Sequence, residues 1–188
     1  MNWYKTAQQN IMQQYEELIG NQRTPQIIGS GQEETITIPG SSQTITARQL
    51  LQQVASRINP ILSQNNVTKI DTSPISQANA QGLAISNEPG IIHVDVKKIF
   101  DTARTALPAI SQTDGIQVDP DIINDVVNKL SQWIEAELLE TSSHESLHMN
   151  DYSNAYKNNQ PFSTVQEAPG EQFGKQIRHQ YFPKEFNR

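Results

Sequence analysis

Residues 119–148 read DPDIINDVVNKLSQWIEAELLETSSHESLH, and the rest of the chain is arranged around them. Asp119 followed by Pro120 is a strong helix start, because the Asp side chain accepts a hydrogen bond from a free backbone N–H and proline has no N–H to leave unpaired. Apolar residues then recur at the helical steps of three and four: Ile122, Ile123, Val126, Val127, Leu130, Trp133, Ile134, Leu138 and Thr141. The pattern predicts one long, well-buried helix over residues 119–150.

This helix ends in an H-E-x-x-H pattern, His144-Glu145-Ser146-Leu147-His148. Residues four apart on a helix lie one turn apart on the same face, so both imidazoles can face one point with Glu145 beside it. Neutral imidazole nitrogens suit Zn²⁺, and a neighbouring carboxylate can take a proton from metal-bound water. A solvated polar helix face would give the same letters, but two of the four His of the chain fall here. We therefore interpret the pattern as a zinc site.

The pattern resembles that of the zincin metallopeptidases, matched residue for residue by His144, Glu145 and His148. The resemblance implies a zinc metalloendopeptidase that hydrolyses peptide bonds with a zinc-activated water and Glu145 as general base, and a peptide or protein substrate as partner. It also implies an antiparallel hairpin beside the motif helix, with an edge strand that can hold substrate backbone. The alternative is a non-catalytic zincin-like protein that binds metal or a partner in a regulatory or assembly role.

Catalytic zinc generally takes three protein ligands. The metzincin extension is absent, since Asp151 and Asn154 stand where that subfamily has Gly and His. The gluzincin plan takes a Glu from a following helix, although the Asn-Glu signature of gluzincins is not matched. With Pro169 at the first helical position, Glu171 would lie in the first turn of that helix, whereas Glu167 would precede it. We expect Glu171 as the third ligand; the alternatives are Glu167, Asp151, His179 or water.

Neighbouring polar residues complete the expected site. Asp151 lies three residues after His148 and is a candidate acceptor for the second ring nitrogen of that histidine. The candidates for steadying an oxyanion are Tyr152, Tyr156 and His179. Each of these residues has an equally ordinary structural interpretation, as a helix-end or surface residue.

Other patterns predict the remaining elements. They are an amphipathic helix within 1–20 capped by Gly20, a strand at 34–38 with a hairpin partner at 43–45, a helix after Thr46 that Pro60 kinks or ends near Ile58, a brief strand at 67–70, a hairpin of 83–85 and 91–96, a helix over 97–107, a polar loop over 150–160, and a helix from Pro169 within a C-terminal segment at 161–188. Together they predict a single α+β domain with a small, mostly antiparallel sheet built from the 34–38 and 83–96 strands. The N-terminal helix is expected to dock on its outside.

Composition narrows the function classes. The 188 residues carry a net charge of −6 with a pI near 5.2 and no basic run, which argues against nucleic-acid binding. Cys is absent, so metal ligands must come from His, Asp or Glu. Neither a long apolar run nor a signal-peptide pattern is seen, so we expect no membrane partner and a cytoplasmic location.

Overall fold

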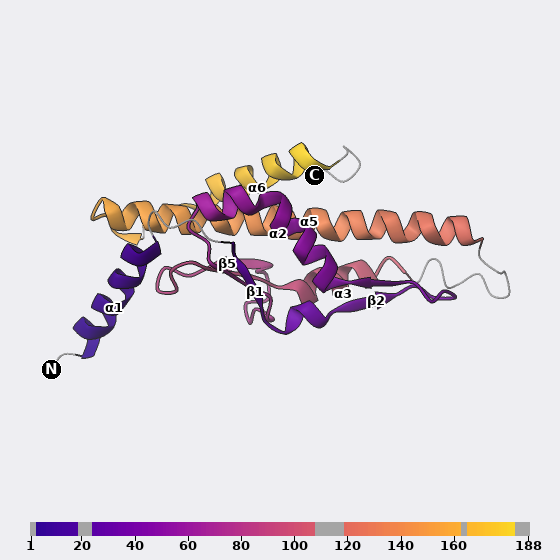
Figure 1. The fold of residues 1–188 in the computed structure, drawn as a ribbon, viewed down its shortest axis with the longest axis horizontal. Helices are drawn as coiled ribbons and strands as arrows, with labels where there is room; N and C mark the ends of the chain where they lie inside the picture. Colours follow the sequence, from indigo (N-terminus) through magenta and orange to yellow (C-terminus); the bar gives the residue numbers. More distant parts are fainter. Residues whose placement is uncertain (1–2, 19–23, 108–118, 163–164, 183–188) are drawn as a thin grey trace.

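The computed structural model describes residues 3–18, 24–107, 119–162 and 165–182, with only the backbone of residues 3–5. These residues form an α+β structure (Figure 1). Its elements are α1 (Trp3–Leu18), β1 (Gln26–Ile28), η1 (Ser30–Glu33), β2 (Thr35–Thr37), β3 (Thr44–Thr46), α2 (Ala47–Gln64), β4 (Lys69–Asp71), β5 (Gly82–Ala84), β6 (Ile91–Val94), α3 (Val96–Arg104), α5 (Pro120–Lys157) and α6 (Glu167–Tyr181).

Helix α5 runs along the longest axis of the molecule (Figure 1). It begins as the sequence predicts, because the Asp119 side chain accepts a hydrogen bond from the Asp121 N–H at 2.9 Å. The predicted end near residue 150 is wrong, and the helix continues to Lys157. Residues 150–160 look like a polar loop in the sequence, but Ser153 and Ala155 are buried, so tertiary packing holds the last two turns in helical form.

The main sheet has the strand order β1-β4-β6-β5. The pairs β1–β4 and β4–β6 are parallel, and only the edge strand β5 is antiparallel, facing β6 with Leu83 opposite His93. The expectation of a mostly antiparallel sheet is therefore wrong. Strands of three or four residues are too short to show their pairing by alternation, and β1 falls in a passage that reads as turns.

Strands β2 and β3 form a separate two-stranded antiparallel sheet. The hairpin partner expected at 43–45 is confirmed, with Ile36 opposite Ile45, but this hairpin does not join the main sheet as predicted. Helix α2 follows Thr46 as expected, although the Thr46 side chain makes no cap hydrogen bond. Of the two expected effects of Pro60, a kink or an end near Ile58, the end is wrong, because the helix passes Pro60 and continues to Gln64.

Helix α5 packs most extensively against α6 and α2, and it also contacts β5, β6 and α3. In Figure 1 the strands lie on one side of α5 and α6 lies on the other. The hydrophobic core lies between the sheet and α5, where Ile92 and Val94 of the sheet and Leu138 and Leu139 of α5 are fully buried. The motif helix is therefore held from two directions.

The hairpin of β5 and β6 and the helix after it are confirmed, with α3 ending at Arg104. Helix α6 begins at Glu167, two residues before the predicted Pro169. The expected cap at Gly20 lies outside the described residues, as do residues 163–164 and 183–188 of the expected C-terminal segment. Among the helices described, none is long and apolar enough to cross a membrane.

Candidate metal centre

The two motif histidines face each other across one turn of α5. Their Nε2 atoms are 2.9 Å apart, and His148 is buried. Ligand atoms of His144, Glu145 and His148 all lie within 4.8 Å of one another. The helical spacing therefore brings together the three side chains that the sequence singles out.

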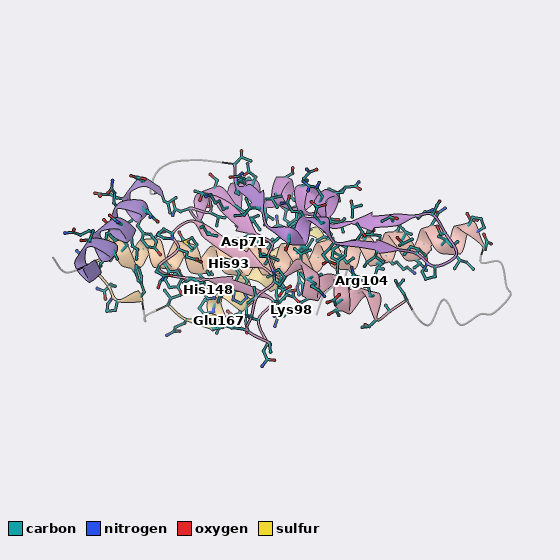
Figure 2. The ribbon with its side chains drawn as sticks, turned by 90° about the horizontal axis from the view of Figure 1, so that it is seen from below. Asp71, His93, Lys98, Arg104, His148 and Glu167 are labelled. Atoms are coloured by element: carbon teal, nitrogen blue, oxygen red, sulfur yellow. The ribbon has the colours of Figure 1, made fainter. Side chains whose placement is uncertain are left out.

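The carboxylate facing this pair is that of Glu167. Its Oε1 lies 2.7 Å from His144 Nε2, and its Oε2 lies 3.2 Å from His148 Nε2. Figure 2 shows His148 and Glu167 next to each other. Glu167 is the first residue of α6, so its backbone is fixed by the helix. Glu171, one turn later, lines the same cleft but makes no ion pair with either histidine in the described part of the chain.

The sequence favours Glu171 because it predicts that the helix begins at Pro169, and that predicted start is wrong. Proline is tolerated throughout the first turn of a helix, because the N–H groups there have no intrahelical partner. Pro169 is the third residue of α6 and not the first. The shift of two residues brings Glu167 into the first turn and moves Glu171 away from the histidines.

The donor set fits a small divalent cation. Two nitrogens bound to a tetrahedral Zn²⁺ at about 2.0–2.1 Å stand about 3.3 Å apart, so the observed pair needs to open by only a few tenths of an ångström. Burial, and then the neighbouring His148, lowers the pKa of His144, which keeps its imidazole neutral, the form that binds metals. The buried Nδ1 of His148 has no hydrogen-bond partner among the described residues. The ring nitrogen of His148 that faces His144 and Glu167, and could bind a metal with them, is Nε2.

Glu145 lies against the edge strand of the sheet. A Cβ atom on Gly82 would stand 2.6 Å from both Glu145 Oε1 and Thr141 Cγ2, so a larger residue there would force the Glu145 side chain to shift. Burial, and then the charge of Glu167, raises the pKa of Glu145 to about 8, while a hydrogen bond from the backbone of Ala84 opposes the rise. The side chain is 6% exposed and held beside the histidines.

Two glycines let α6 approach α5 over the site. A Cβ on Gly170 would stand 2.7 Å from His144 Cδ2, and one on Gly174 would stand 2.7 Å from the Glu140 carbonyl oxygen. The sequence interpretation missed this pair, although glycines four residues apart on a helix are a recognisable signal of close helix packing. Because these two glycines have no side chains, α6 lies close to α5, and Glu167 at the start of α6 can reach the histidines.

A buried ion pair fixes α6 further along. Arg178, 1% exposed, donates to Glu137 Oε1 and Glu140 Oε2 of α5, both at 2.7 Å. Gln81, just before β5, donates to the Glu137 carboxylate at 3.2 Å and to Thr141 Oγ1 at 2.9 Å. The edge strand, α5 and α6 are thus joined through Glu137. Arg178 and Gln81 carry no motif, so the sequence did not identify them.

The site opens into a cleft of about 980 Å³. Its walls come from residues 77–84, α5 and α6. Of the three oxyanion candidates only Tyr152 lines it. Tyr156 stacks on Tyr15 with ring centroids 5.8 Å apart, and His179 is exposed on α6 and does not line the cleft.

Asp151 does not play the expected part. It lines a separate hollow with Leu147 and Asn154, and His148 Nδ1 donates no hydrogen bond to it. Burial raises the pKa of Asp151, and His148 opposes the rise. Asp151 is therefore a half-buried residue of α5 that lines this neighbouring hollow and not the cleft.

Comparison of the chain with protein-family models, with curated proteins and with solved structures finds no match.

Proposed function

We propose that the protein is a zinc-dependent endopeptidase whose metal is held by His144, His148 and Glu167. The observation that carries the proposal is the convergence of these three side chains on one point, with separations of 2.7, 2.9 and 3.2 Å, at the floor of a cleft. Three protein ligands beside open space are the arrangement of catalytic zinc, whereas structural zinc has four protein ligands. This ligand set revises the expected one by replacing Glu171 with Glu167.

A bound Zn²⁺ would supply Lewis acidity, lowering the pKa of water and polarising a peptide carbonyl. Glu145 is the residue that moves protons in this proposal. Its carboxylate takes a proton from the attacking water and passes it to the leaving amine. The burial that raises its pKa suits this role, because a general base is most effective when its pKa lies near the working pH.

The edge strand β5 supports a peptide as the substrate. Gly82, Leu83 and Ala84 line the cleft, and among the strands that the structure describes β5 pairs only with β6. An extended peptide can hydrogen-bond to such an edge by adding a further strand. The cleft volume of about 980 Å³ is at the upper end of the range of roughly 300–1,000 Å³ for small-molecule sites, which suits a segment of several residues.

Tyr152 is the residue proposed to steady the oxyanion. It lies one turn after His148 on α5, lines the cleft, and is held by an edge contact with the Phe162 ring at 5.6 Å between centroids. Its hydroxyl is protonated at neutral pH, since burial and then Glu145 raise its pKa above the usual 10.0. A fixed hydroxyl donor of this kind stabilises charge that develops in the transition state.

The deciding experiment compares Glu145→Gln with the wild-type chain. Glu145→Gln should keep zinc bound at about one ion per chain and lose at least about a hundredfold in cleavage of an unstructured protein, the lower range for loss of a general base. Asp151→Asn is the matched control on the same helix and should retain activity. Cleavage by Glu145→Gln at the wild-type rate contradicts the mechanism. A zinc-loaded wild type that cleaves nothing assigns the protein instead to the non-catalytic metal-binding class.

A further inference from the structure

The segment of residues 75–81 provides one wall of the cleft through residues 77–81, yet few of its side chains are packed in the core. The side chains of residues 76–79 are all exposed, and that of Ile75 is only half-buried. Residues 77–81 line the cleft opposite α5 and α6. Because the segment buries no large side chain, its position depends on hydrogen bonds, which are those of the Gln81 side chain to Glu137 and Thr141 at one end and those to its backbone elsewhere.

Lys98 of α3 provides three of these hydrogen bonds. Its Nζ donates to the carbonyl oxygens of Ile75 at 3.1 Å, Gln77 at 2.7 Å and Ala80 at 2.7 Å. An ammonium group has three N–H donors, so all of them are used within one segment. Lys98 is labelled in Figure 2. Hydrogen bonds from a charged donor are stronger than those between neutral groups.

Asp95 fixes the two ends of the same segment. Its Oδ2 accepts from the Ile75 N–H at 2.7 Å, and its own N–H donates to the Gln81 carbonyl at 2.8 Å. Asp95 Oδ2 also lies 3.4 Å from Lys98 Nζ, and Asp95 is 1% exposed. The ends are therefore anchored in the protein interior, and the middle of the segment rests on Lys98.

From these contacts we propose that Lys98 is a positioning residue that holds residues 75–81 as the cleft wall and so determines how tightly an extended peptide is bound. The part that concerns the peptide rests on the proposed function. Lys98 makes no contact with His144, His148 or Glu167 within the described residues, so it does not take part in the chemistry. Loss of its ammonium affects substrate binding and leaves the metal and Glu145 in place.

The test uses the full chain and three variants. Lys98→Met removes the charge and the three donors while keeping a long side chain. Lys98→Arg keeps the charge, but a planar guanidinium cannot direct three N–H groups at carbonyls that surround one point. Lys97→Met is the matched control, because Lys97 is the neighbouring residue of the same helix and pairs with the exposed Asp101 on that helix at 2.6 Å.

Two readouts are measured on each variant. Hydrogen–deuterium exchange of residues 75–81 reports the wall itself, and should become about tenfold faster in Lys98→Met and faster in Lys98→Arg, with no change in Lys97→Met. Cleavage of an internally quenched peptide reports binding and chemistry separately. KM should rise at least about tenfold in Lys98→Met, the factor for losing even one of the three hydrogen bonds from the charged group, while kcat and bound zinc stay within about twofold of the wild type.

Unchanged exchange in Lys98→Met overturns the inference whether or not the wild type cleaves peptides. Faster exchange with an unchanged KM in an active enzyme overturns the part that concerns the substrate. If the wild type has no activity, the proposed function fails, and faster exchange in Lys98→Met still supports Lys98 as the residue that fixes the wall.

Discussion

Glu167 and Glu171 lie one turn apart on α6, and both line the cleft, but only Glu167 contacts the two histidines. The difference follows from where α6 begins and from the missing side chains of Gly170 and Gly174. No propensity argument predicts a start two residues before Pro169, because proline is acceptable at each position of the first turn. The position of His144 and His148 on one face of α5, in contrast, depends only on the helical period, and their spacing in the sequence predicts this geometry correctly.

Substitution of these two glutamates by glutamine gives a matched test of the ligand set. Glu167→Gln should lower zinc affinity by at least about tenfold, since loss even of a residue that only supports a ligand has that effect. Glu171→Gln should stay within about threefold, because its carboxylate acts on the site only through its charge. Competition with a chromogenic chelator measures both affinities. A larger loss in Glu171→Gln would restore the ligand first expected from the sequence.

Among the elements, α5 and α6 show which boundaries the sequence can and cannot define. The start of α5 has a local cause, the Asp119 side chain, and is predicted to within a residue. Its end has a non-local cause, the burial of Ser153 and Ala155 under neighbouring elements, and is missed. The parallel pairing of β1 with β4 and of β4 with β6 is likewise set by contacts between distant segments. Short strands carry too few residues to reveal it.

The junction of α5 and α6 depends on the ion pair of Arg178. Arg178→Met should lower the free energy of unfolding by about 3–5 kcal/mol, because it leaves the buried carboxylate of Glu137 without its cation. Arg48→Met, which breaks an exposed pair with Glu33, should change it by less than about 1 kcal/mol. Urea denaturation of the zinc-free proteins measures both values. Equal effects of the two substitutions would mean that Arg178 does not hold the helices together.

Over the whole molecule, aromatic residues connect the N-terminal helix α1 to α5 and to the segment that follows it. The Tyr15 ring lies 5.8 Å from that of Tyr156 and 5.5 Å from that of Phe162, between centroids. The Tyr15 hydroxyl donates to the Ser86 carbonyl at 2.6 Å, in the turn between β5 and β6. Helix α1 therefore docks on the outside of the fold, as the sequence predicts, with Tyr15 fully buried and Leu18 buried as well.

This tyrosine makes stability sensitive to alkaline pH. Burial, and to a smaller extent Tyr152, raises the pKa of Tyr15 above its usual value of 10.0. A raised pKa in the folded state means that the contribution to stability is complete below pH 10 and is lost as the pH rises above it, because the unfolded chain releases the proton more readily. The unfolding free energy of the wild type should thus fall above pH 10 more steeply than that of Tyr15→Phe.

Tyr15→Phe should also be about 1 kcal/mol less stable at neutral pH, since it loses the hydrogen bond to Ser86. Urea denaturation at a series of pH values measures both effects, and the difference between the two proteins removes the contribution of other alkaline groups. Parallel curves for the two proteins would show that the Tyr15 hydroxyl is solvated in the folded state.

The recessed edge strand has a further consequence, for the behaviour of the protein at high concentration. An uncovered sheet edge is a template on which copies of a protein aggregate. Strand β5 is three residues long and lies in a cleft with α5 behind it and residues 77–81 alongside. A single extended chain can reach such an edge, but the sheet of a second folded copy is kept away by the walls. The recess proposed to admit a substrate would therefore also keep two copies of the protein from pairing through β5, one of the two edges of the main sheet.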